Sequence, residues 1–233
     1  MALQPFHRVH SHSLVRLLAS LLTVSALTGC SILGQGAVDP KGQIPDSEAV
    51  TKQSNSKACG QFATPLTPKE QEYAAAAWQY FVNNRQPKTG FTNSAHQFPS
   101  GTLWDQGNYL MALNAARWFG LIDQDEFDLQ LNQFLTSLGE IPLVVGALPN
   151  KVYNSATGEM VDYANKPTKT GLGWSALDIG RLLVAFHIIR TCHPQYDNWI
   201  SGIVAGWQVP RSIKEKQLYG AVVKTDGSLL PVQ

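Results

Sequence analysis

Two stretches of the sequence begin with the same arrangement of a hydroxyl, a carboxylate and a glycine. The first is TLWDQG, residues 102–107, and the second is SALDIG, residues 175–180. A serine or threonine followed three residues later by an acid is the capping pattern of a helix start, so each stretch predicts one. Capping by itself accounts for Asp105 and Asp178. A structural role of this kind is compatible with a chemical one.

The glycines of these two openings are not explained by capping. Glycine inside a helix costs about 1 kcal/mol relative to alanine, so Gly107 and Gly180 favour close approach by another backbone or a ligand. Two matching helix starts predict helical hairpins whose equivalent ends gather on one side. A flat sugar ring can lie on an aromatic side chain while carboxylates bind its hydroxyls or act at its anomeric carbon. We therefore expect a cleft for a sugar lined by Asp105, Asp178, Trp104 and Trp174.

Further polar side chains gather in the long connection between the two openings. They are Asn150, Lys151, Tyr153, Glu159 and Asp162, on either side of a turn-like Ser-Ala-Thr-Gly. Loops on a rigid scaffold often carry function, so we expect this group to contribute to substrate binding. The alternative is a solvated hairpin with ordinary turn residues.

Arg181 follows the second glycine, in the first turn of its predicted helix. A cation there opposes the helix dipole unless it meets a carboxylate or a ligand. We expect an ion pair with Asp178 or a neighbour, and we include Arg181 among the substrate-binding candidates.

The elements that position these residues are mainly helical. Apolar residues at a 3.6-residue period, bounded by caps and glycines, predict five helices. Short β-hairpins are predicted near residues 150–163 and around Asp226-Gly227. The predicted helices cover residues 68–83, 103–119, 124–138, 176–191 and 194–205.

The first thirty residues have the pattern of an export signal. A basic segment ending at Arg16 precedes an apolar run too short to span a bilayer, which would need roughly 20 residues. The run ends in Leu-Thr-Gly-Cys30, which resembles the lipobox of bacterial lipoproteins. We therefore expect a signal peptide over 1–29, a lipidated Cys30 with a flexible tether over 30–66, and one domain over 67–233.

Charge and residue usage exclude several classes of function. The formal net charge is +1, and removing the two arginines of the signal leaves 16 basic against 17 acidic residues. This balance lacks the basic surface of a nucleic-acid-binding protein. The histidines show no metal-ligand spacing, so neither a metal nor another cofactor is expected. An oxidising compartment permits Cys59 and Cys192 to pair, but their positions in the sequence favour two free thiols.

Three blocks carry a family resemblance. The runs TLWDQGNYLMALNAARWFGLID, LPNKVYNSATGEMVDY and GLGWSALDIGRLL resemble, in order, the signature blocks of a bacterial family catalogued as domain of unknown function thirty-one thirty-one. That family is similar to glycoamylase-like and β-glucan-active domains of the (α/α) toroid type. The resemblance implies a mainly α, incomplete (α/α) toroid-like array of helical hairpins, in a domain that lacks the last helices of the toroid.

Together these features predict a lipid-anchored protein of the cell envelope, periplasm-facing or at the outer membrane. Its helical domain is expected to bind or hydrolyse a glucan, with Asp105 and Asp178 as the catalytic acids if it is a glycoside hydrolase. The alternative is a non-catalytic lipoprotein that supports an envelope or polysaccharide-export assembly through protein contacts.

Overall fold

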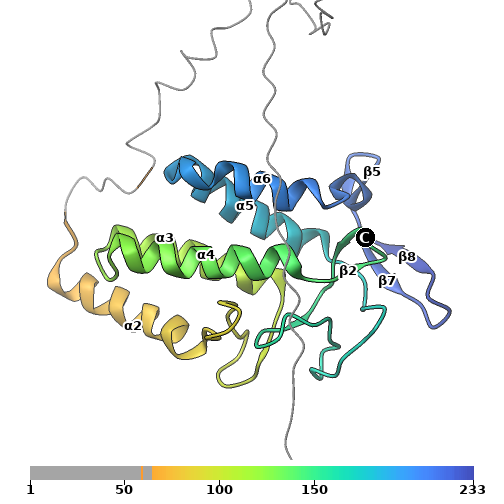
Figure 1. The fold of residues 1–233 in the computed structure, drawn as a ribbon, viewed down its shortest axis with the longest axis horizontal. Coiled ribbons are helices and arrows are strands. Elements are labelled where there is room, and N and C mark those ends of the chain that lie inside the picture. The colour runs from red at the N-terminus through yellow and green to blue at the C-terminus, as the bar shows by residue number, and fades with distance from the viewer. Residues whose placement is uncertain (1–58, 60–64) are drawn as a thin grey trace, which may run out of the picture. The chain divides into compact units, whose positions relative to one another are not determined.

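The structure is a computed structural model that describes Cys59 and residues 65–233 (Figure 1). The predicted signal peptide and Cys30 lie outside the described residues. Within this part of the chain, no helix is long and apolar enough to cross a membrane. The described α-helices are α2 (Pro68–Asn84), α3 (Leu103–Trp118), α4 (Gln124–Glu140), α5 (Ala176–Cys192) and α6 (Asp197–Ala205).

Helices α2 to α5 begin at the caps that the sequence predicts. Thr67 and Glu70 form a capping box at the start of α2, and Asp123 accepts a 2.8 Å hydrogen bond from the backbone N–H of Glu126 at the start of α4. One predicted end is wrong, because α4 continues through Gly139 to Glu140. A Cβ at Gly139 would lie 3.8 Å from Cγ1 of Ile203, an ordinary van der Waals contact, so α4 faces α6 here and the glycine does not end the helix.

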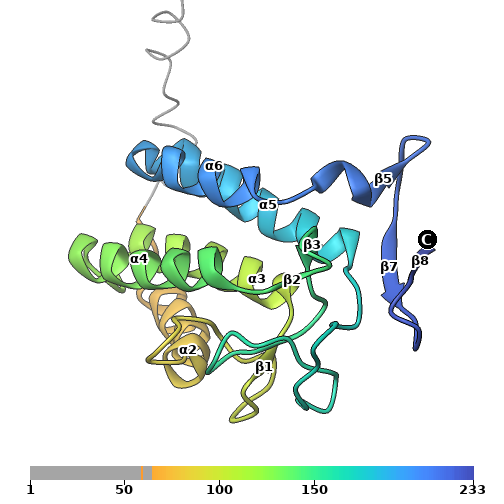
Figure 2. The same ribbon diagram turned by 45° about the vertical axis from the view of Figure 1, so that its right-hand side comes forward.

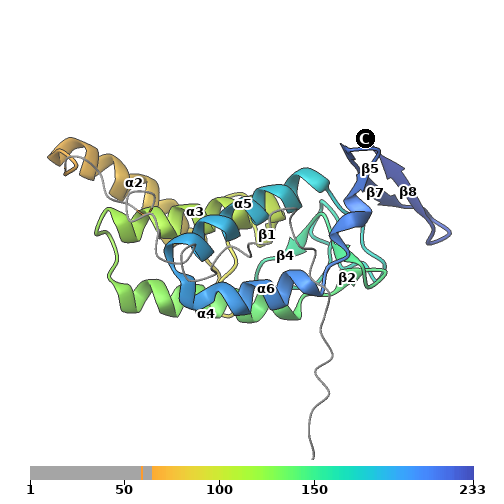
Figure 3. The ribbon, with the colours of Figure 1, turned by 90° about the horizontal axis from the view of Figure 1, so that it is seen from above.

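The helices α3 to α6 form two layers, with α3 and α5 in one and α4 and α6 in the other (Figure 3). Gly107 explains the close contact of the first pair, because a Cβ there would lie 3.2 Å from the backbone carbon and oxygen of Arg181. Gly180 has no such neighbour within 4 Å. The predicted backbone approach is therefore confirmed for the first glycine and absent for the second.

The core lies between these layers and contains the apolar faces expected of α3 and α4. Tyr109, Leu113, Phe127 and Phe134 are fully buried. The predicted apolar side of α2 is different: Tyr73 is 62% exposed, and only partly buried Trp78 and Phe81 pack against the core. Helix α2 therefore packs on the core through only a narrow apolar face.

The strands are short antiparallel pairs in the connections, and several lie beside the helix starts (Figure 2). The predicted turn at Ser155–Gly158 forms, and Tyr153 bridges Met160 across it, but the ladder of this segment is made with β1 instead. The hairpin predicted around Asp226-Gly227 is confirmed. The pairs are β1 (Ser100–Gly101) with β4 (Tyr153–Asn154), β2 (Leu143–Val144) with β3 (Leu148–Pro149), β5 (Ile213–Lys214) with β6 (Gln217–Leu218), and β7 (Gly220–Val223) with β8 (Leu229–Val232).

Two features of the C-terminal half differ from the sequence prediction. The helix expected from Pro194 begins as a 3₁₀ turn, η2 (Pro194–Tyr196), before α6 starts at Asp197; a second 3₁₀ turn, η3 (Val209–Ser212), follows α6. Cys59 and Cys192 are joined by a disulfide, with their Cα atoms 5.2 Å apart. The expectation of two free thiols is therefore wrong, because the fold brings Cys59 to Cys192 at the end of α5.

Candidate functional site

The carboxylate of Asp105 is held at the start of α3 by the residue that caps the helix. Oδ2 of Asp105 accepts hydrogen bonds from the backbone N–H and the hydroxyl of Thr102, at 2.9 and 2.8 Å. The Asp105 N–H donates to the Thr102 hydroxyl oxygen at 3.3 Å. This is the predicted capping box, and it fixes the direction of the carboxylate.

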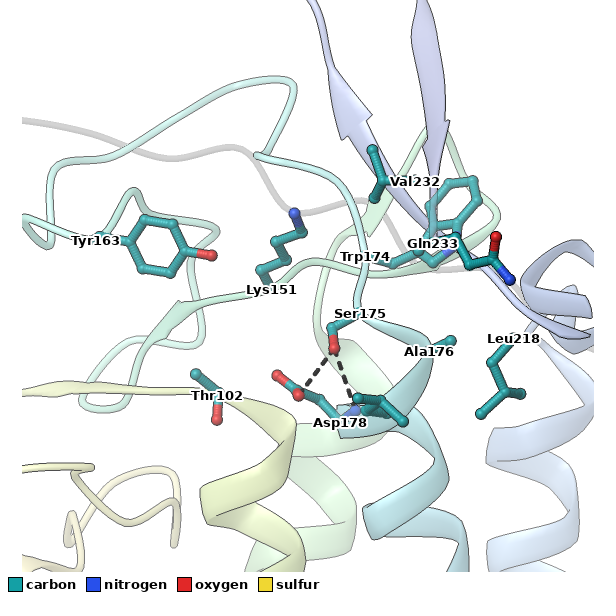
Figure 4. A pocket seen from close by; sticks show the side chains of 12 residues that line it. Thr102, Lys151, Tyr163, Trp174, Ser175, Ala176, Asp178, Leu218, Val232 and Gln233 are labelled. Atoms are coloured by element: carbon teal, nitrogen blue, oxygen red, sulfur yellow. Dashed lines mark hydrogen bonds between the residues drawn. The ribbon is translucent and has the colours of Figure 1, made fainter.

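Asp178 is held in a related but looser way at the start of α5. The Ser175 hydroxyl donates to Oδ1 of Asp178 at 2.9 Å and accepts from the Asp178 N–H at 3.3 Å (Figure 4). The backbone N–H of Ser175 is not part of this cap, which leaves more of the Asp178 carboxylate open to other partners.

A pocket of about 410 Å³ opens at the start of α5. Its walls come from the α3 cap, the connection before α5 and the C-terminal strands, and Asp178 is the lining carboxylate (Figure 4). Asp105 is not part of the wall, but its capping partner Thr102 is. The lining residues include Thr102, Lys151, Tyr163, Trp174, Ser175 and Asp178.

The surroundings of Asp178 raise the pKa of its carboxyl above the ordinary value. Burial is the largest cause, and the negative charge of Asp105 adds to it. The hydrogen bond from Ser175 and the positive charge of Lys151 act in the opposite direction. The two aspartates of the repeated openings are therefore close enough to interact electrostatically, and one holds its proton to a higher pH than a free side chain.

Trp104, expected to line the same cleft as the two aspartates, does not line the pocket and instead lies against Arg181 at the α3 start. Trp104 is 44% exposed, and the Arg181 guanidinium lies 5.2 Å from the centre of its ring. Arg181 Nε also donates to Oδ1 of Asn108 at 2.9 Å. The expected ion pair of Arg181 is absent from the described residues, because a neutral amide and an aromatic face satisfy the cation instead.

Trp174 lines the pocket but cannot act as an open stacking surface. It is only 4% exposed, and the Arg211 guanidinium lies 5.6 Å from the centre of its ring. Its buried indole N–H has no hydrogen-bond acceptor among the described residues. The side chain therefore forms a wall, and its N–H remains an unused donor.

The predicted loop residues divide into different roles, and only Lys151 reaches the pocket. Asn150 is buried; its amide donates to the Val152 carbonyl at 2.7 Å and accepts from the Leu172 N–H at 2.7 Å. Tyr153 is also buried, and its hydroxyl donates to the Pro142 carbonyl at 2.7 Å. Asn150 and Tyr153 organise the connection and offer no free group to a ligand.

The two loop carboxylates also lie away from the pocket wall. Glu159 accepts a hydrogen bond from the Thr157 hydroxyl at 3.0 Å and lines a separate hollow. Asp162 accepts from the N–H groups of Ala164 and Lys166, both at 2.9 Å, and closes a turn. Neither is placed to act with Asp178 in the pocket.

Sequence reasoning missed most of the wall, including Tyr163 and the C-terminal residues Val232 and Gln233. Tyr163, which follows Asp162, is 70% exposed and presents an aromatic ring to the pocket. Val232 and Gln233 reach the pocket because Ala221 N–H bonds the Trp174 carbonyl at 3.0 Å and docks the β7–β8 hairpin there. An exposed tyrosine in a polar loop was the available signal for Tyr163, whereas nothing local marks the strand residues.

No group of histidine, cysteine, aspartate or glutamate side chains in the described part of the chain is arranged to hold a metal ion. The groups available for chemistry at the pocket are thus a carboxyl with a raised pKa, a nearby carboxylate, an ammonium and a phenol ring.

The family model described as "Protein of unknown function (DUF3131)" matches residues 72–233. The chain belongs to this family. No curated protein matches the sequence.

Solved structures share the fold at low identity. A β-1,2-glucanase from Parabacteroides distasonis has 18% identity and a TM-score of 0.52, over 71% of this chain and 25% of the glucanase. An endo-β-1,2-glucanase from Chitinophaga pinensis, solved with sophorotriose and glucose, has 15% identity and a TM-score of 0.47, over 62% of this chain and 37% of that one. The DUF3131 chain therefore spans well under half of either glucanase, and it has the expected fold, a helical-hairpin array of the (α/α) toroid type.

Proposed function

We propose that this DUF3131 domain binds a glucan at the pocket beside the starts of α3 and α5, and hydrolyses it with Asp178 and Asp105. The observation that carries the proposal is the pair of carboxyl groups at equivalent ends of two neighbouring helices, one of them with a raised pKa. The fold shared with the Parabacteroides distasonis β-1,2-glucanase supports a glucan as the ligand.

The proposed chemistry assigns a different task to each acid. Protonated Asp178 gives its proton to the glycosidic oxygen of the leaving sugar, and ionised Asp105 activates a water or attacks the anomeric carbon. The Tyr163 ring provides the apolar surface for a sugar ring, and Lys151 limits the rise in the pKa of Asp178. Trp104 and Arg181 extend the binding surface at the α3 start.

The first experiment measures reducing ends released from a panel of soluble glucans by the full chain and by its Asp105→Asn/Asp178→Asn variant. Asparagine keeps the oxygen that accepts the capping hydrogen bonds but cannot transfer a proton. We expect release by the wild type and a loss of at least about 100-fold in the variant, as is usual for general acid–base groups. The control is Asp123→Asn, which makes the same chemical change at the exposed N-cap of α4 and should leave release unchanged.

Thermal melting of the same samples separates loss of chemistry from loss of folding. Equal rates in the wild type and the double variant would refute the assignment of the acids. If both folded proteins release nothing and bind no glucan, the alternative of a non-catalytic envelope scaffold is favoured, and a stoichiometric protein partner in pull-downs would support it.

We also propose that the domain is anchored to a membrane of the cell envelope through lipid on Cys30. The support is the Leu-Thr-Gly-Cys sequence after a short apolar run. We expect the wild type to incorporate labelled palmitate in a bacterial host and Cys30→Ala to lose it. Equal labelling of both proteins would disprove the anchor.

A further inference from the structure

A second groove lies between α4 and α6 and shares no residue with the pocket described above. Its volume is about 390 Å³. It runs from the C-terminal end of α4 and the start of β2 along α6 to Gly206 and Trp207, the two residues that follow α6. The lining residues include Leu138, Gly139, Asn198, Trp199, Gly202 and Trp207.

Glycines create the space in this groove. Gly202 lies within α6, and a Cβ there would meet nothing within 4 Å. A glycine inside a helix costs about 1 kcal/mol against alanine, and here no packed neighbour requires it. Gly139 and Gly202 both line the groove, and the absence of side chains there adds to its open volume.

The chemistry of the lining favours a neutral ligand with hydroxyl groups. No aspartate, glutamate, lysine, arginine or histidine is among the residues that line the groove. Trp199 is 40% exposed and offers an open ring, whereas Trp207 is 7% exposed. Within the described residues neither indole N–H has a hydrogen-bond acceptor, and the Asn198 amide also lacks a protein partner.

These groups match the two sides of a sugar ring. The apolar face of a hexose packs on an aromatic ring, and its hydroxyls accept from indole N–H groups and bond in both directions with an amide. A charged ligand would find no counter-ion in the groove, so its charge would remain unpaired.

We propose that the α4–α6 groove is a second, non-catalytic binding site for a neutral glucan, with Trp199 as its stacking surface. The choice of glucan rests on the proposed function, while the assignment of a neutral sugar rests on the groove. Because no carboxyl group lines it, the groove holds the chain of the polysaccharide and does not cleave it.

Calorimetric titration with a soluble, neutral β-1,2-glucan tests this site. The full chain carrying Asp105→Asn/Asp178→Asn is the background, so that the ligand is not consumed. Adding Trp199→Ala is expected to weaken binding about tenfold or more, as for removal of a central aromatic contact. Adding Gly202→Leu keeps both tryptophans, fills the groove and is expected to weaken binding equally. Tyr73→Ala, which removes an exposed aromatic from α2, is the matched control and should leave affinity unchanged.

Each outcome tests glucan binding by the groove independently of catalysis. Unchanged affinity in folded Trp199→Ala and Gly202→Leu proteins would overturn the second site, and so would an absence of binding by the background variant. Release of reducing ends by the wild type is measured separately, so the proposed hydrolysis stands or fails without reference to the groove.

Discussion

The protonation of Asp178 depends on a negatively charged neighbour, Asp105, and a positively charged neighbour, Lys151. Burial and Asp105 raise the pKa of its carboxyl, while Ser175 and Lys151 oppose the rise. The native pKa lies above the reference value of 3.8, so the native state holds this proton more tightly than the unfolded chain. The resulting stability is fully present below the unfolded pKa and is lost as pH rises through the native pKa.

Changing the two neighbouring charges should move the pKa of Asp178 in opposite directions. Lys151→Met removes the charge that favours the carboxylate and is expected to raise the pKa further, whereas Asp105→Asn is expected to lower it. Carboxyl ¹³C NMR titration measures both shifts without requiring activity. The control is Lys169→Met, at an exposed loop position outside the pocket wall, which should leave the pKa of Asp178 unchanged. An unchanged pKa of Asp178 in Lys151→Met would contradict the proposed effect of Lys151.

The two matching helix starts have different surroundings, although their sequences are alike. Gly107 packs against the backbone of α5, and Gly180 packs against nothing within 4 Å. A repeated pattern therefore encodes the same cap twice, while the contact made by its glycine depends on the next helix in the array.

Alanine substitutions at these glycines are expected to change stability with opposite signs. Gly180→Ala should raise the free energy of unfolding by about 0.5–1 kcal/mol, because it removes the helix penalty of glycine without a clash. Gly107→Ala should lower it by about 1–3 kcal/mol, because the new methyl group forces α3 and α5 apart. Urea denaturation measures both; stabilisation by Gly107→Ala would show that the helices separate at little cost.

The Cys59–Cys192 disulfide connects the start of the domain to its second helical hairpin. The two residues are 133 positions apart, so the bond closes a loop that contains α2, α3, α4 and nearly all of α5. Cross-linking residues so distant in sequence restricts the unfolded chain strongly.

Removing this cross-link should destabilise the whole domain. Cys59→Ser/Cys192→Ser is expected to lower the free energy of unfolding by about 2–4 kcal/mol and Tm by roughly 5–15 °C. The wild type in a dithiol reductant should show the same loss of stability. Peptide mass mapping without reductant identifies the bond directly. A pair of free thiols in the folded, air-oxidised protein would refute it.

The sequence by itself determined the starts and caps of α2 to α5 and the turn at Asp226-Gly227. Capping boxes such as Thr102–Asp105 and the turn at Asp226-Gly227 depend on groups a few residues apart, so their hydrogen bonds can be predicted from contiguous residues. The apolar periods of α3 and α4 correctly identified buried residues such as Leu113 and Phe134, because burial of one face follows from helical geometry.

Only the tertiary structure decided which of the polar and aromatic candidates face a ligand. Asn150 and Tyr153 are buried and bond backbone groups of other segments, and Trp174 is covered. Tyr163 is exposed and lines the same pocket as Asp178. The physical reason is that exposure and hydrogen-bond partners are set by chain segments far away in sequence. The pairing of Cys59 with Cys192 follows the same rule, since proximity is a property of the assembled helices.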